Sequence, residues 1–189
     1  MTNNTQNHRL SGQIDPQKQC QLPQWGLIIV EGADAATFLQ NQLSNSVLGL
    51  KATPPTKVAK NNDAVRLIGY CSPKGRLLAS AWIALFPVEG SSEDRFGLFI
   101  SADIASAVAK RLSMFVLRSK VTVLDISSQC TISCMIGSDE EISSVSLGAD
   151  QLGLRLPDVL LNSQILARVL IADLNQSEVD LDEEYLNNW

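Results

Sequence analysis

The chain has 189 residues, 45% of them hydrophobic and 19% charged, with a net charge of −5. This is the composition of a folded globular protein with room for one core, or for one domain and part of another. The acidic balance argues against a nucleic-acid binder or a protein held on an anionic membrane. No apolar run approaches the roughly 20 residues of a spanning helix, and the N-terminus is polar, so we expect a cytoplasmic protein.

The first elements follow from local composition and periodicity. Residues 1–22 are rich in Asn, Gln, Thr and Ser, and we expect a mobile tail there. Trp25–Val30 predicts a strand, and Ala35–Leu48 carries an apolar stripe that predicts a helix. Gln42 falls inside that stripe, where its amide is either satisfied by the backbone or points into a polar cavity.

A second group of elements completes a sheet. Residues 51–62, with two prolines and a polar end, predict a loop. The elements expected after it are strands at Ala64–Cys71, Arg76–Phe86 and Arg95–Ile100, a helix from Ser101 or Asp103 to Leu117, and a strand at Lys120–Ile126. The second strand is long and almost uncharged, which indicates a central strand covered on both faces. The order predicts an α+β fold, an antiparallel sheet with helices on one face in a split βαβ-like arrangement.

The connection between the first two strands of this group is short and cationic. Pro73 suits the second position of a turn, and Gly75 can supply the positive φ that closes it. Lys74 and Arg76 flank that glycine, so the turn could hold a carboxylate or phosphate. The alternative is an ordinary solvated hairpin tip, since Gly, Pro and Ser are common in turns generally.

After Ser127 the sequence changes character. Thr131–Ile136 and Leu166–Ala172 predict strands, but the stretch between them is rich in Ser, Asp, Glu and Gly. A few strands without a strong helix make a poor core, so this half needs a partner chain or a continuation of the same chain. We therefore divide the chain into a tail (1–22), a first α+β domain (23–127) and a partial β-rich second domain (128–189).

The cysteines and the single histidine offer little catalytic chemistry. The four cysteines have no C-x-x-C spacing, and His8 lies in the polar tail. Neither a metal site nor a Ser-His-Asp or Cys-His arrangement is expected from this inventory. Cys130 and Cys134 fall on one face of a β-like run and are interpreted as small core residues.

Three motifs together resemble a known family. They are Gly32-Ala33-Asp34-Ala35 followed by Phe38-Leu39-Gln40-Asn41-Gln42-Leu43-Ser44, then Cys71-Ser72-Pro73-Lys74-Gly75-Arg76-Leu77-Leu78, then Leu117-Arg118-Ser119-Lys120-Val121-Thr122-Val123. In this order and spacing they resemble the folate-binding YgfZ family, relatives of the glycine-cleavage T protein, an aminomethyltransferase. The resemblance covers about Trp25 to Ile126 well. It implies the first part of a multidomain ring around a tetrahydrofolate-binding channel, and a role in making or repairing iron–sulfur proteins.

The sequence departs from that family in two ways. The family's Lys-Gly-Cys-Tyr-x-Gly-Gln-Glu signature is absent, so we expect the N-terminal part of a longer family member. Aminomethyltransferases carry a pair of acids where this chain has Ala79 and Ser80. Losing a charge aimed at the reacting centre typically costs orders of magnitude in rate. The resemblance therefore implies a folate-binding auxiliary protein, not an aminomethyltransferase, and we assign no catalytic residue.

The functional hypothesis is a tetrahydrofolate-binding protein that serves iron–sulfur cluster assembly. Its expected folate contacts are Lys74, Gly75 and Arg76 for the glutamate carboxylates, with Gln42 and Ser72 as polar contacts to the pterin or linker. One alternative is an interaction module that docks on cluster-assembly partners without folate. Another is residual folate-dependent aminomethyl transfer. An unpaired strand edge in the second half is also a route to a strand-paired dimer.

Overall fold

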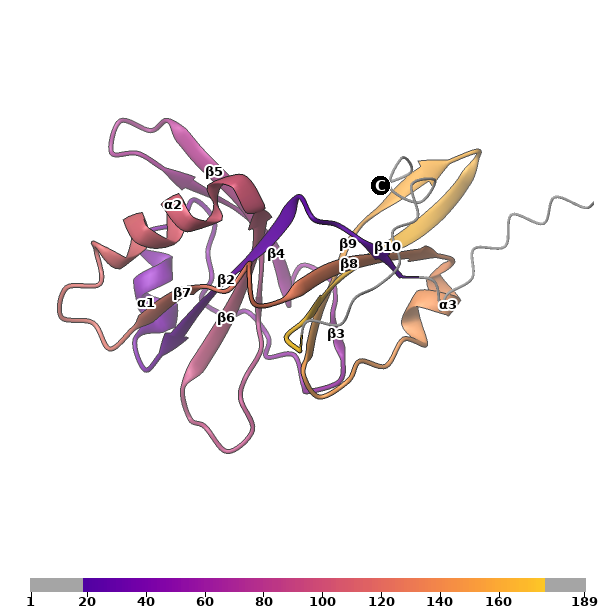
Figure 1. Cartoon of the computed structure of the whole chain (residues 1–189), viewed down its shortest axis with the longest axis horizontal. Coiled ribbons are helices and arrows are strands. Elements are labelled where there is room, and N and C mark those ends of the chain that lie inside the picture. Colours follow the sequence, from indigo (N-terminus) through magenta and orange to yellow (C-terminus); the bar gives the residue numbers. More distant parts are fainter. Residues whose placement is uncertain (1–18, 176–189) are drawn as a thin grey trace, which may run out of the picture.

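Two five-stranded β-sheets, packed face to face, organise residues 19–175, the part of the chain that this computed structural model describes (Figure 1). The first sheet has the strand order β4-β5-β6-β2-β7 and the second β1-β8-β10-β9-β3. The elements are β1 (Cys20–Gln21), β2 (Trp25–Gly32), α1 (Ala35–Gln40), β3 (Val58–Ala59), β4 (Val65–Cys71), β5 (Leu77–Leu85), β6 (Asp94–Ser101), α2 (Ala102–Ser113), β7 (Thr122–Asp125), β8 (Thr131–Gly137), α3 (Asp139–Ser143), β9 (Gln151–Leu161) and β10 (Gln164–Asp173).

The first sheet is antiparallel throughout, and α1 and α2 cover one of its faces (Figure 1). Side chains alternate along β2, so that Ile28 and Val30 pack under the helices while Leu27 and Ile29 face the second sheet. This confirms the predicted α+β class with helices on one face. The face turned away from the helices is covered by a sheet, which the sequence did not indicate.

Coverage of β5 differs from the prediction along its length. The strand lies between β4 and β6, and Ile83 and Ala84 in its second half are buried on opposite faces. Its first residues are not covered: the side chain of Leu77 is 63% exposed. The prediction that Arg76–Phe86 is buried on both faces is therefore wrong for the half next to the turn, because the second sheet does not extend that far.

Two strands of the second sheet lie in segments that were predicted to be a tail and a loop. β1 lies within the range 1–22 that was expected as a tail, and β3 lies within the expected loop 51–62. β9 and α3 lie in the stretch between residues 136 and 166, for which no element was predicted, and α3 begins with a capping box. The chain passes from the first sheet to the second for the last time between β7 and β8, near residues 127 and 128.

Burial shows why the second sheet does not need a strong helix of its own. One of its faces shares a core with the first sheet, in which Leu154 and Leu170 pack with Phe99 and Leu27. Its other face packs on Ile142 of α3. The expectation of a poor second core was wrong, since the first sheet supplies the missing cover. No helix among residues 19–175 is long and apolar enough to cross a membrane.

Candidate functional site

The turn between β4 and β5 has the predicted geometry. Ser72 O accepts a hydrogen bond from Gly75 N at 2.8 Å, and Ser72 N donates to Arg76 O at 2.8 Å. Gly75 has a φ of +75°, and a Cβ added there would meet nothing within 4 Å. The backbone at Gly75 is therefore open to a ligand. The hydroxyl of Ser72 accepts from Arg76 N at 3.2 Å, so it already stabilises the turn.

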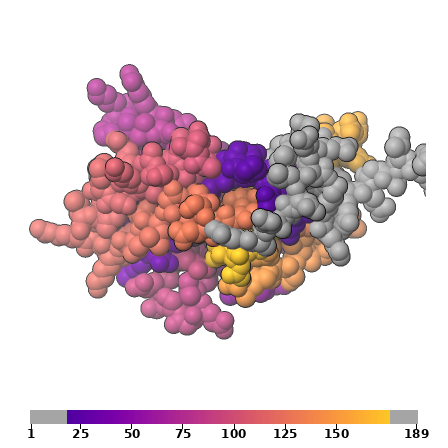
Figure 2. Space-filling view, viewed as in Figure 1, coloured from indigo at the N-terminus to yellow at the C-terminus, as the bar shows by residue number. Residues whose placement is uncertain are grey.

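Lys74 and Arg76 extend from the tip of this hairpin into solvent. Both are exposed, and the hairpin stands out from the body of the molecule in the space-filling view (Figure 2). No ion pair holds either side chain among the contacts described for residues 19–175. Two uncompensated cations at a projecting tip suit a flexible anionic group, which can reach them without entering a deep pocket. Their role in folate binding stays a prediction.

Gln42 does not lie in a helix. The predicted helix Ala35–Leu48 ends at Gln40, because the Gln40 side chain turns to the following loop and its Oε1 accepts from Val47 N at 2.9 Å and Leu48 N at 3.2 Å. Leu43 then forms an antiparallel bridge with Tyr70. This register sets Gln42, half-buried, beside the end of β4. Sequence reasoning selected Gln42 and missed the structural role of Gln40.

A hollow of about 270 Å³ lies on the first sheet, further along β5 from the turn. The residues lining it are Gln24, Trp25, Leu67, Ser80, Ala81, Trp82 and Ser101. Ser80 is exposed, whereas Ala79 is buried under the helices. Of the two positions where the resemblance places the acids of aminomethyltransferases, only Ser80 faces this hollow. From Arg76 to Ser80 the strand runs about 13 Å.

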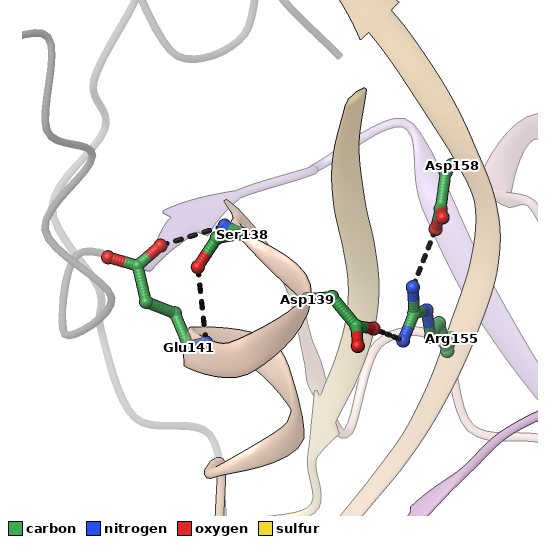
Figure 3. Close-up of polar contacts among 5 residues, drawn as sticks. All are labelled: Ser138, Asp139, Glu141, Arg155 and Asp158. Atoms are coloured by element: carbon green, nitrogen blue, oxygen red, sulfur yellow. Dashed lines mark hydrogen bonds and ion pairs between the residues drawn. The ribbon is translucent and has the colours of Figure 1, made fainter. Parts of the chain in front are cut away.

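A second cavity, of about 430 Å³, lies between the two sheets on the other side of Trp82. Arg155 of β9 projects into it and pairs with Asp139 of α3 and, at 2.8 Å, with Asp158 (Figure 3). The hydrogen bond to Asp158 is the main cause that raises the pKa of Arg155. With two carboxylates on one guanidinium, this ion-pair group joins α3 to β9. No sequence pattern indicated this ion-pair group, because its three residues come from two elements that were not predicted.

No group of three or more His, Cys, Asp or Glu in residues 19–175 could hold a metal ion. Cys20, Cys130 and Cys134 are buried in the core between the sheets. The interpretation of Cys130 and Cys134 as core residues is confirmed, but only Cys134 lies in a strand, because β8 begins at Thr131. His8 lies outside the described residues.

Comparison with known sequences gives distant relatives over part of the chain. The chain is 31% identical over 111 residues to the mitochondrial iron–sulfur cluster assembly factor IBA57 homolog of Mycosarcoma maydis, covering 59% of this chain and 27% of that protein. It is 34% identical over 101 residues to an uncharacterized protein of Haemophilus influenzae, covering 53% of this chain and 31% of that one. The chain thus spans less than a third of the length of these relatives. No family model matches it.

The fold also matches a solved structure. The glycine cleavage system aminomethyltransferase T of Bartonella henselae superposes with a TM-score of 0.56 at 15% identity, covering 82% of this chain and 41% of that one. At this identity the likeness establishes the fold alone. Together with the sequence matches it confirms the predicted resemblance as far as a distant similarity to an iron–sulfur cluster assembly factor homolog and a fold shared with part of an aminomethyltransferase.

Proposed function

Because this chain is a distant homologue of an iron–sulfur cluster assembly factor, we propose that it serves iron–sulfur cluster assembly as a tetrahydrofolate-binding auxiliary protein. The match over 111 residues supports the assembly role, and it is the observation that carries the proposal. The hollow on the first sheet supports the folate role. Each half is tested separately, since a protein can serve cluster assembly without binding folate.

The lining of the hollow suits the chemistry of a reduced folate. Trp25, Leu67 and Trp82 offer aromatic and apolar surface for a flat pterin ring. Ser80 and Ser101 add hydroxyl groups that can bond to its polar edge. A folate is long, with its glutamate carboxylates at the end remote from the pterin. In this proposal those carboxylates reach Lys74 and Arg76, which lie about 13 Å or more along the hairpin.

The residue in the hollow also favours an auxiliary role over aminomethyl transfer. Ser80 is the only one of the two acid positions that faces the hollow, and its hydroxyl carries no charge. It cannot supply the negative charge that an acid at this position would bring to a bound folate. Binding without group transfer is the expected outcome, and incubation with a one-carbon-loaded folate, ammonia and a thiol acceptor for the aminomethyl group should leave that folate unchanged.

Calorimetric titration with tetrahydrofolate tests the folate half. Ser80→Trp should abolish binding because the new indole fills the hollow, while Ser91→Trp, at an exposed turn, should bind as the wild type does. Lys74→Ala and Arg76→Ala should each weaken binding about tenfold, the usual worth of a charge-assisted contact. Equal affinity in the wild type and Ser80→Trp would refute the placement of the ligand in this hollow.

The assembly half needs a readout that does not involve folate. In cells lacking this protein, we expect the activity of a cluster-containing enzyme to fall. That activity should recover when the wild-type protein is expressed again. If Ser80→Trp also restored the enzyme activity, the assembly role and the folate role would be separate, and the chain would serve assembly without folate. No loss of cluster enzyme activity would refute the assembly role.

A second candidate, a docking module that acts without folate, is favoured by one observation. Leu160 and Ile165 lie directly opposite each other at the tip of the β9–β10 hairpin and are 73% and 71% exposed. An exposed apolar pair on a projecting hairpin is a feature of interaction surfaces. Leu160→Ser with Ile165→Ser should remove cluster-enzyme recovery under this alternative and leave folate titration unchanged.

A further inference from the structure

Cys20 and Cys134 lie directly opposite each other on neighbouring strands. They come from β1 and β8, which pair antiparallel with the register Cys20 to Cys134. Both side chains are thiols in this structure and both are fully buried, at 0% exposure. They are 114 positions apart in the sequence, so only the tertiary fold brings them together.

Their backbone geometry suits a disulfide bond. Leu22 N donates to Ile132 O at 2.8 Å, two residues along the same ladder, so Cys20 and Cys134 occupy a hydrogen-bonded pair as well. The Cα atoms of such a pair are about 5.5 Å apart, which lies within the usual range for disulfides. The Cβ atoms of a hydrogen-bonded pair are about 5.5 Å apart, so they must approach by about 1 Å for the bond to form. Cys130 lies just before β8, and the strand residues between it and Cys134 keep the two cysteines apart, so Cys130 does not compete for Cys134.

The same burial protects the thiols while β1 stays in place. Desolvation raises the pKa of Cys134 to about 12, so the thiolate that attacks a disulfide does not form in the closed structure. β1 has only two residues and lies at the edge of the second sheet. Short edge elements open more readily than core strands. Opening of β1 therefore exposes both thiols at once, and closing returns them to contact distance.

We propose that Cys20 and Cys134 are a redox modification site that reacts with a small-molecule disulfide, such as oxidised glutathione, to form a reversible cross-strand disulfide. One cysteine thiolate attacks the glutathione disulfide and releases one molecule of reduced glutathione, leaving a mixed disulfide. The second cysteine thiolate attacks the protein sulfur of that mixed disulfide and releases the second glutathione. Two protein thiols are oxidised, one glutathione disulfide is reduced to two thiols, and both thiol protons are accounted for.

The bond would fasten β1 over the core that joins the two sheets. Cys20 and Leu22 both belong to that core, so releasing β1 uncovers it. A disulfide between residues so distant in sequence also restricts the unfolded chain strongly. The oxidised protein should therefore resist separation of its sheets more than the reduced protein does, which links the redox state of the surroundings to the stability of this domain pair.

The test uses the full chain, incubated with oxidised glutathione and then alkylated, and peptide mass spectrometry. We expect a peptide pair joined through Cys20 and Cys134, loss of two hydrogens from the intact mass, and reversal by dithiothreitol. The Cys71→Ser/Cys130→Ser variant, which retains the pair, should show a rise in the melting temperature of about 10 °C on oxidation. Adding Cys20→Ser to that variant should abolish the rise.

The contrary results are equally specific. Glutathione attached only to the half-exposed Cys71, with Cys20 and Cys134 both recovered as alkylated thiols, would overturn the proposal. A stable mixed disulfide at Cys20 that never resolves onto Cys134 would do the same. The wild-type peptide map decides the matter even where a substituted variant fails to fold.

Discussion

Gly32, at the end of β2, occupies a position where no other residue fits. Its φ is +131°, a region that residues with a side chain rarely adopt. A Cβ added there would lie 2.2 Å from the backbone oxygen of Lys120. That oxygen cannot swing aside like a side chain, so Gly32→Ala should force apart the two segments that carry the first and third sequence motifs.

The loss of stability in Gly32→Ala can be worked out from the hydrogen bonds that would have to lengthen or break. Lys120 N donates to the carboxylate of Asp34 at 2.7 Å, and Asp34 N donates to Lys120 O at 3.3 Å. Losing each costs about 1 kcal/mol, and the unfavourable φ adds about 1–3 kcal/mol. We expect Gly32→Ala to reduce the free energy of unfolding by about 3–5 kcal/mol, which lowers the melting temperature by about 10 °C.

Urea unfolding followed by tryptophan fluorescence measures this effect, and the chain supplies a matched control. Gly49 also has a positive φ, +77°, but a Cβ added there meets nothing within 4 Å. Gly49→Ala should cost only about 1 kcal/mol, from the backbone conformation alone. If the two substitutions cost the same, the close approach of Gly32 to Lys120 contributes nothing and our reasoning fails.

Three further predictions concern stability. Gln40→Ala should lower the free energy of unfolding by about 1–3 kcal/mol in urea titration, because it removes the acceptor for Val47 N and Leu48 N, whereas Gln42→Ala should lower it by less. Ser138→Ala should cost about 1 kcal/mol in the same assay by breaking the capping box of α3 with Glu141, and a neutral result would show that this short helix is held by packing alone. The raised pKa of Cys134, about 12 against an ordinary value of 9.0, means that the unfolded chain releases the thiol proton first, so unfolding free energy should fall as pH rises from about 9 to 12. Cys134→Ala should show a shallower fall over that window, and an identical slope would contradict the assignment.

The predictable part of the fold is the part whose signal is local. The apolar side chains of β2 and α2 recur with the periods of a strand and a helix, and both elements form close to their predicted places. Pro73 and Gly75 specify the turn by their backbone preferences, and the turn is formed as predicted. The cationic part of the candidate site was also predictable, since two cations and a glycine on one turn are visible in the sequence without a structure.

The less predictable part depends on partners that are distant in sequence. α1 ends early at Gln40 because the side-chain oxygen of Gln40 accepts a hydrogen bond from Val47 N in the following loop. The helical periodicity of the apolar residues does not indicate this contact. The hollow beside Ser80 joins residues from β4, β5 and the start of β2, and only their pairing brings them together. Of the five predicted folate contacts, the structure gathers all at one end of the first sheet and none among the residues lining that hollow.

The sequence by itself determined the α+β class, the hairpin turn with its cations, and the three motifs of the predicted resemblance, because each element, turn or motif rests on residues that are close together in the chain. Tertiary structure decided the rest. The two-residue strands β1 and β3 carry no pattern of their own and form only because β8 and β9 offer them hydrogen bonds. The pairing of β1 with β8 also places Cys20 opposite Cys134. The second sheet has a core because its apolar face packs on the first sheet, and burying apolar surface is favourable wherever the fold brings two such surfaces into contact.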